Sequence, residues 1–264
     1  MRIALVSLDQ KWEDKVGNKA QCRLISQEIV EICPDIDLIV YPEMTLTGFS
    51  VKNVSLAEPE KSSDTISFFS SLSSQLKVNH IFGVSIKNEQ DECFNRSGCI
   101  DRVGKLIAQY DKMHTFSFAG ENELYTRGHK PQEFVYGNAV IGLSICFDLR
   151  FSQLYSYYRK NCNLAINIAN WPGSRKEHWL SLLQSRAIEN QFYMKGVNRI
   201  GVDGTGVNYA PTSVVFSPLG ELLSPMLTKK EYAVYDIDLD NVKKIRSQFP
   251  FINDLRPELY SEFK

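Results

Sequence analysis

The chain of 264 residues lacks the features that mark membrane-spanning, metal-binding and nucleic-acid-binding proteins. No apolar run reaches the roughly 18 residues that suggest a membrane span. The formal net charge is −1, so no broad field favours nucleic acid or an anionic membrane. The six cysteines include no Cys-x-x-Cys pair, which disfavours zinc and redox motifs. We therefore expect no nucleic-acid partner, no membrane partner and no bound metal.

The cysteines and the N-terminal residues also indicate the cellular compartment of the protein. Single scattered cysteines without an export signal are typical of a reducing cytoplasm. The run from Met1 to Leu8 is too short for a signal peptide and predicts a first buried strand. These patterns predict a cytoplasmic protein.

The order of apolar patterns predicts an α/β fold with layered sheets covered by helices. No Gly/Ser-rich or Pro-rich linker and no repeat divides the chain, so we expect one domain over residues 1–264. The expected strands are residues 3–8, 38–41, 81–86, 93–100, 106–110, 134–135, 139–145, 164–169, 194–198, 213–216 and 232–237. The expected helices are residues 18–32, 65–76, 154–159, 176–190 and 239–246. The tail from about 249 is aromatic, charged and aperiodic, and is expected to pack on the body or on a partner subunit.

Cys146 is the first candidate for chemistry. It ends the apolar run 139–145, and a helical pattern begins near Ser152. A side chain at such an elbow stands at the rim of a sheet, where open α/β architectures bind ligands. A thiol placed there is a candidate nucleophile if its neighbours can deprotonate it. The other five cysteines are expected to be ordinary core or surface residues.

Glu43 and Lys112 also follow predicted strands, and rigid strand ends hold side chains better than mobile loops do. A glutamate can take the thiol proton, hand it to a leaving amine and later activate water. A lysine favours the thiolate and can stabilise an oxyanion, with the backbone N–H of Phe147 as a second donor. The four histidines form no Cys/His/Asn arrangement, which disfavours a papain-like enzyme. Considered singly, a glutamate or lysine in such a place is more often a surface or salt-bridge residue than a catalytic one.

The segments around these three residues resemble the signatures of the nitrilase, or carbon–nitrogen hydrolase, superfamily. The family's Pro-Glu, Lys-x-His and Cys-x-Asp-x-Arg-Phe elements are matched, in the family's order, by residues 42–43, 112–114 and 146–151. Residues 170–172, 178–179, 182–183, 186–191 and 198–201 also look like that family, so the resemblance covers nearly the whole chain. It implies that Cys146 is the nucleophile, Glu43 the general base and Lys112 the oxyanion stabiliser.

The resemblance implies further properties of the site and the fold. The family often has a second catalytic glutamate, and Glu121 is preferred because it stands seven residues before Gly128; Glu123 is expected to be a solvated loop residue. The implied fold is a four-layer αββα sandwich of the nitrilase type. A homodimer or higher even oligomer is expected, and neither a metal nor an organic cofactor is implied.

Within the superfamily the chain looks most like the bacterial omega-amidases, which hydrolyse 2-oxoglutaramate and 2-oxosuccinamate to the oxo-diacid and ammonia. Residues 169–175, 186–191 and 249–250 carry this likeness. The distal carboxylate of such a substrate suits the bidentate fork of an arginine. Arg175 is the candidate, with Trp171 lining the pocket, although a surface arginine at a helix start is an equal alternative. Arg150 is expected to pair with Asp148 or another acid.

Other functions stay open at this point. Pro211, Phe147 and the pair Ser152-Gln153 depart from residues common in related sequences, which puts the substrate preference in doubt. The same machinery could act on deaminated glutathione, a carbamoyl-amine or a nitrile. A catalytically silent scaffold of the same fold is disfavoured, because an unused set of Glu43, Lys112 and Cys146 would be free to drift.

Overall fold

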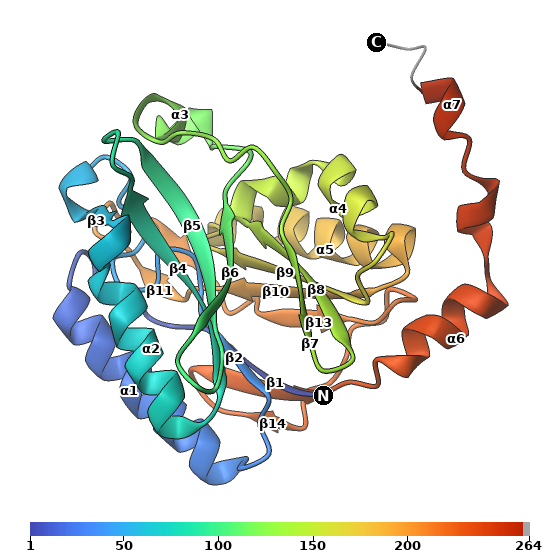
Figure 1. Cartoon of the computed structure of the whole chain (residues 1–264), viewed down its shortest axis with the longest axis horizontal. Coiled ribbons are helices and arrows are strands. Elements are labelled where there is room, and N and C mark those ends of the chain that lie inside the picture. Colours follow the sequence, from blue (N-terminus) through green and yellow to red (C-terminus); the bar gives the residue numbers. More distant parts are fainter. Residues whose placement is uncertain (261–264) are drawn as a thin grey trace.

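The strands of this computed structural model, which describes residues 1–260, form two mixed sheets that face each other (Figure 1). The larger sheet has the order β14-β15-β1-β2-β4-β5-β6, with β3 beside β4. The smaller sheet has the order β13-β10-β9-β8-β7. A separate short ribbon joins β11 (Gly201–Val202) to β12 (Asn208–Tyr209). Within the described residues, no helix combines the length and the apolar character needed to cross a bilayer.

Strand bounds in the larger sheet are β1 (Arg2–Val6), β2 (Leu38–Val40), β3 (Glu58–Pro59), β4 (Asn79–Lys87), β5 (Cys93–Ile100), β6 (Leu106–Asp111), β14 (Leu227–Thr228) and β15 (Tyr232–Asp236). Those in the smaller sheet are β7 (Glu133–Tyr136), β8 (Ala139–Ile145), β9 (Leu164–Ala169), β10 (Tyr193–Asn198) and β13 (Val214–Phe216).

Helices cover the outer face of each sheet, so the layers are α, β, β and α, as the family resemblance implied (Figure 1). The larger sheet is covered by α1 (Lys15–Ile32) and α2 (Asp64–Leu76), and the smaller by α4 (Ser152–Tyr158) and α5 (Lys176–Asn190). The remaining helices are α3 (Glu121–Leu124), α6 (Asp240–Gln248) and α7 (Pro257–Tyr260). The 3-10 turns are η1 (Val54–Leu56), η2 (Glu60–Ser62), η3 (Ser117–Ala119), η4 (Cys146–Arg150), η5 (Gly173–Arg175) and η6 (Phe251–Asp254).

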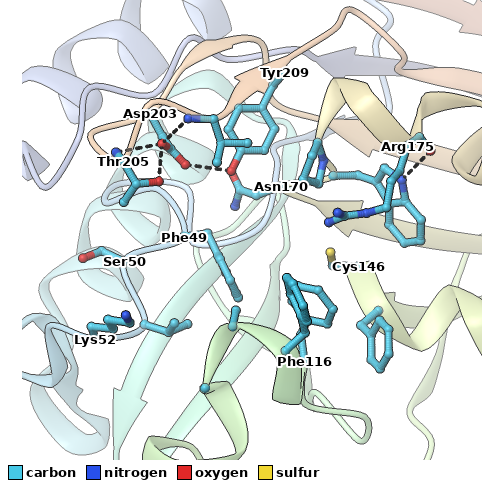
Figure 2. A pocket seen from close by; sticks show the side chains of 18 of the residues that line it. Phe49, Ser50, Lys52, Phe116, Cys146, Asn170, Arg175, Asp203, Thr205 and Tyr209 are labelled. Carbon is cyan, nitrogen blue, oxygen red and sulfur yellow. Dashed lines mark hydrogen bonds between the residues drawn. The ribbon is translucent and has the colours of Figure 1, made fainter.

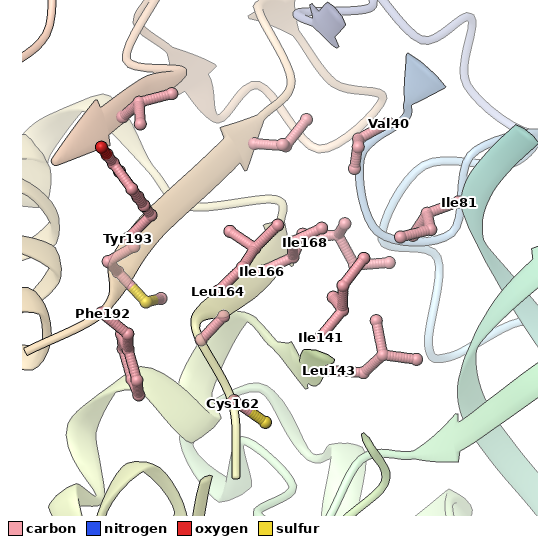
Figure 3. Packing of buried hydrophobic residues seen from close by; sticks show 14 of the residues in the cluster. Val40, Ile81, Ile141, Leu143, Cys162, Leu164, Ile166, Ile168, Phe192 and Tyr193 are labelled. Atoms are coloured by element: carbon pink, nitrogen blue, oxygen red, sulfur yellow. The ribbon is translucent and has the colours of Figure 1, made fainter. Parts of the chain in front are cut away.

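Strand β1 shows why four layers form. Ile3 and Leu5 belong to the core cluster between the sheets, whereas Ala4 and Val6 belong to the cluster beneath α1 and α2. Successive side chains of a strand point to opposite faces, so an uninterrupted apolar strand must be covered on both sides. Figure 3 shows the core between the sheets around Ile166 of β9.

Every strand and helix expected from the sequence is present, with ends shifted by a few residues. The two-residue strands β3, β11, β12 and β14 and the one-turn helix α3 were not predicted, because such short elements carry no periodic pattern. The tail expected to be aperiodic contains η6 and α7 and extends away from the body (Figure 1). Its residues 261–264 lie outside the described part of the chain.

Gly83 of β4 supports the backbone that carries Glu43. A Cβ at position 83 would overlap the backbone nitrogen of Met44 and lie 2.8 Å from the Cα of Glu43. We expect Gly83→Ala to lower the free energy of unfolding by about 1–3 kcal/mol, as other overpacked cores do. Gly98→Ala in β5 is the control, because its Cβ would meet side-chain atoms and not backbone, the nearest being the end of the Phe82 ring at 3.0 Å. Denaturant unfolding measures both variants, and equal losses would contradict this account.

Candidate active site

Glu43, Lys112 and Cys146 come together at one end of the sandwich. Glu43 follows β2 and Lys112 follows β6, both in the larger sheet, while Cys146 follows β8 in the smaller one. The Nζ of Lys112 lies 3.0 Å from the Oε1 of Glu43. Both charged side chains are buried, whereas Cys146 is partly exposed to a cavity. The site therefore forms only where the two sheets meet.

Glu121, the glutamate preferred from the sequence, also lies in this cluster. It opens helix α3 directly after Gly120, whose φ of +76° gives the tight turn that brings the carboxylate inward. Its Oε2 accepts hydrogen bonds from Lys112 Nζ at 2.9 Å and from the backbone N–H of Phe116 at 2.7 Å. Glu123, two residues further on, is exposed and lines the cavity that also contains Cys146.

Asn95 of β5 completes the buried cluster, and the sequence did not single it out. Its Nδ2 donates to Glu43 Oε1 at 2.7 Å and to Glu121 Oε1 at 2.8 Å. Its backbone oxygen accepts from the backbone N–H of Lys112 at 2.9 Å. The only signal for it in the sequence is a polar residue inside an otherwise buried strand.

Electrostatics at the cluster disfavour a resting thiolate. Burial, together with the carboxylates of Glu43 and Glu121, raises the pKa of the Cys146 thiol well above its ordinary value, although Lys112 opposes this shift. Lys112 favours the thiolate, as expected, but burial and the two carboxylates outweigh its effect. Burial alone would lower the pKa of Lys112, but Glu121 and Glu43 outweigh it and raise the pKa. The resting site thus combines a neutral thiol with a charged ammonium.

Cys146 begins the turn η4 with a φ of +44°, a conformation that is costly for a residue with a side chain. The buried carboxylate of Asp148 holds this elbow. Its Oδ2 accepts from the backbone N–H of Ile145 at 3.0 Å and from the Tyr110 hydroxyl at 2.8 Å. Its Oδ1 accepts from the backbone N–H of His114 at 2.9 Å. Tyr110 and His114 flank Lys112 in the sequence. Asp148 therefore connects the segment that carries Lys112 to the turn that carries Cys146.

Among the described residues Arg150 forms no ion pair with Asp148 or with another acid, contrary to expectation; its contacts are with the His178, Phe147 and Trp171 rings. The carboxylate of Asp148 already accepts hydrogen bonds from the residues that flank Lys112, including one from the His114 ring at 2.8 Å. The guanidinium of Arg150 lies 5.0 Å from the ring centroid of Trp171 and lines the same cavity as Cys146. A cation stacked on an aromatic ring is stabilised without a carboxylate partner, so it remains free to bind one.

The cavity beside Cys146 has a volume of about 710 Å³ and largely aromatic walls (Figure 2). Arg175 lines it, and Figure 2 shows its guanidinium directed toward the space above Cys146. The guanidinium stacks 5.7 Å from the ring of Phe116. Trp171 contributes a wall, and its indole N–H donates to the backbone oxygen of Arg175 at 2.9 Å. The ribbon β11–β12 closes the far side through Tyr209.

Phe147 is the second residue of η4 and lines the cavity with its ring. Backbone N–H groups at the start of a helical turn have no acceptor within the turn, so that of Phe147 can donate to a bound oxygen. Among residues 1–260, no three His, Cys, Asp or Glu side chains gather as a metal site requires. The arrangement can therefore supply a thiol, a base and two oxyanion donors from the chain itself.

Comparison with known proteins places these residues in a recognised family. The profile of the carbon–nitrogen hydrolase family matches residues 2–247. A Staphylococcus lugdunensis protein described as a hydrolase in the agr operon is 36% identical over 86% of this chain and 97% of its own length. The 2-oxoglutaramate amidase of Paenarthrobacter nicotinovorans is 32% identical over 89% of this chain and 83% of its own. A CN-hydrolase superfamily structure from Xanthomonas campestris, with an arsenic adduct in its active site, is 28% identical with a TM-score of 0.89, over 97% of both chains.

Proposed function

This chain belongs to the carbon–nitrogen hydrolase family and is a hydrolase of C–N bonds, and we propose that its substrates are small dicarboxylate monoamides. It converts the ω-amide of 2-oxoglutaramate or 2-oxosuccinamate to the acid and ammonia. The observation that carries the proposal is the buried set of Glu43, Lys112 and Glu121 beside Cys146, in a cavity that also holds Arg175. The amidase relative supports the substrate class.

In the proposed reaction, the Sγ of Cys146 attacks the amide carbonyl while Glu43 takes the thiol proton. The raised pKa of Cys146 supports this coupling, because a neutral thiol must lose its proton as the S–C bond forms. The negative oxygen of the tetrahedral intermediate is stabilised by the Lys112 ammonium and the Phe147 N–H. Glu43 then protonates the nitrogen, the C–N bond breaks and ammonia leaves. Water, deprotonated by Glu43, hydrolyses the thioester and restores the thiol.

Substrate orientation in this proposal depends on Arg175. Its planar fork can bind the distal carboxylate through two parallel hydrogen bonds, which places the amide at Cys146. Arg150 is more exposed and contacts the His178 ring at 3.4 Å, at the edge of the same cavity. We therefore assign the carboxylate to Arg175 and a role at the cavity entrance to Arg150.

A second candidate substrate class is a larger amide such as deaminated glutathione. The cavity of about 710 Å³ supports it, because cavities of roughly 300–1,000 Å³ enclose drug-sized ligands, whereas a five-carbon monoamide fills only part of that space. The same Cys146 chemistry applies to both classes. Only the groups that contact the rest of the acyl chain differ.

Ammonia release tests the amidase proposal directly. We expect the purified protein to release ammonia from 2-oxoglutaramate faster than from succinamate, glutamine or deaminated glutathione. Cys146→Ala should abolish release while its thermal unfolding stays close to that of the parent, because the cavity side of Cys146 is partly open. Undiminished activity of Cys146→Ala would reject the nucleophile. Preferential release from deaminated glutathione would favour the larger substrate class.

Arg175→Lys keeps the positive charge but loses the bidentate fork. We expect it to raise the KM for 2-oxoglutaramate by about tenfold to a hundredfold, the range of a lost hydrogen bond to a charged group. The KM for a neutral amide such as butyramide should not change. Arg150→Lys is the matched control and should leave both KM values near those of the parent. A larger effect at Arg150 than at Arg175 would reverse the assignment.

We also propose that two copies pair through the arm formed by residues 249–260. Phe249, Phe251, Leu255 and Leu259 are exposed along this arm, which extends away from the body (Figure 1). Exposed apolar side chains gathered on one segment are typical of a surface buried by a partner.

Deletion of residues 251–264 should convert the dimer to a monomer, because it removes three of these four side chains. The deletion begins after Phe249, so the hydrogen bond from Gln191 to the Phe249 backbone oxygen is kept. Val103→Ser, which changes an exposed apolar residue in the turn between β5 and β6, is the control and should remain dimeric. Light scattering after size-exclusion chromatography measures both. A parent monomer, or a deletion variant that stays dimeric, would exclude this arm as the interface.

A further inference from the structure

Asn95 occupies an unusual position among the buried charges. Its single amide nitrogen bridges Glu43 Oε1 and Glu121 Oε1, at 2.7 and 2.8 Å. Lys112 bridges the same two oxygens, at 3.0 and 3.1 Å. The two carboxylates are thus held by one cationic donor and one neutral donor. Asn95 itself is 1% exposed.

The amide of Asn95 restricts where a proton can reside. An amide nitrogen can only donate hydrogen bonds, and both of its hydrogens are used by carboxylate oxygens. Glu43 Oε1 receives a second donor, the ammonium of Lys112. A carboxylate oxygen that accepts two such bonds is a poor position for a proton. The other oxygen of Glu43, Oε2, accepts only the backbone N–H of Asn170, at 2.9 Å, among the described residues.

The backbone N–H of Asn170 lies beside both Glu43 and Cys146. Besides meeting Glu43 Oε2, it lies close enough to Cys146 to stabilise the thiolate form. Both the thiol and Glu43 Oε2 are therefore beside the same backbone group.

We propose that Asn95 is a positioning residue that directs the transferred proton to Oε2 of Glu43. This inference rests on the proposed role of Glu43 as the general base. As the S–C bond forms, the thiol proton moves from Sγ to Oε2. It then moves from Oε2 to the amide nitrogen as the C–N bond breaks, so the base returns to its starting state. Throughout, Asn95 and Lys112 keep Oε1 unprotonated.

A neutral donor suits this position better than a second cation. With the thiol neutral, Glu43, Glu121 and Lys112 together carry one net negative charge. A second lysine at position 95 would cancel that charge and make Glu43 a weaker base. Asn95 stabilises both carboxylates by hydrogen bonds and leaves the base able to accept a proton.

The ionisable groups facing Glu43 are Lys112, Glu121 and Cys146, with Tyr125 further away. Burial raises the pKa of Tyr125 to about 12, and its hydroxyl meets that of Ser85 at 2.8 Å. Neither Tyr125 nor Lys112 changes charge between pH 5 and 9. A change in pH dependence within that interval therefore reports on the two carboxylates and the thiol.

The test is the pH dependence of Cys146 alkylation by iodoacetamide in the full-length protein, followed by peptide mass spectrometry. Alkylation requires loss of the thiol proton, so the fall of its rate toward low pH (the acid limb) reports how readily the carboxylates and the thiol together release that proton, without any amide substrate. Asn95→Asp removes the donor, adds a third carboxylate and keeps the shape of the side chain. Both changes favour the protonated form of Glu43. We expect the acid limb to move to higher pH by at least about one unit.

Asn79→Asp is the matched control. Asn79 is also 1% exposed, lies on the neighbouring strand β4, and bonds only to backbone groups of Asp37 and Arg102. It should lose stability without moving the acid limb. If Asn95→Asp does not fold, Asn95→Ala removes the donor without adding charge and should move the limb in the same direction by less.

The proposal would be overturned if the acid limb of alkylation did not move in the folded Asn95 variant. It would also be overturned if Asn79→Asp moved the acid limb by the same amount. Failure of the proposed substrates is distinguishable from this result. A protein that releases no ammonia from any tested amide, yet shows the shifted alkylation limb, would retain the role of Asn95 and lose only the substrate assignment.

Discussion

The structure is organised around two carboxylates and one ammonium that are buried together beside the cavity. Each such ion loses several kcal/mol of hydration free energy on burial, which only close partners can recover. Glu43 and Glu121 repel each other, and Lys112 lies between them at 3.0 and 2.9 Å. One negative charge is left without a cation. Neutral donors offset it: the amide of Asn95 and the backbone N–H groups of Phe116 and Asn170.

That excess charge determines the state of the nucleophile. A thiolate beside it would add a second unbalanced anion, so Cys146 stays protonated at rest. A protonated thiol is a weak nucleophile and also reacts slowly with oxidants and alkylating agents. The strained elbow at Cys146 and the carboxylate of Asp148 hold the thiol at the cluster that contains Glu43, the proposed base, so that deprotonation can coincide with attack.

The sequence predicted those parts of the site that follow apolar strands. Glu43, Lys112 and Cys146 each follow such a run, and the alternation of strands with amphipathic helices predicted the layers. Glu121 was identified only through the family resemblance. Asn95 was missed because its partners are 52 and 26 residues away in the sequence. Arg150 was misassigned because proximity to Asp148 in the sequence does not show that donors from β6 already occupy that carboxylate.

The division of the site between two sheets also bears on how activity arises during folding. The base and the ammonium are carried by the larger sheet, and the thiol by the smaller one. The larger sheet is itself assembled from both ends of the chain, because β1 pairs with β15. Catalysis is therefore a property of the finished tertiary structure alone. A chain whose two sheets have not yet packed together carries the same reactive groups but lacks the arrangement that brings them together.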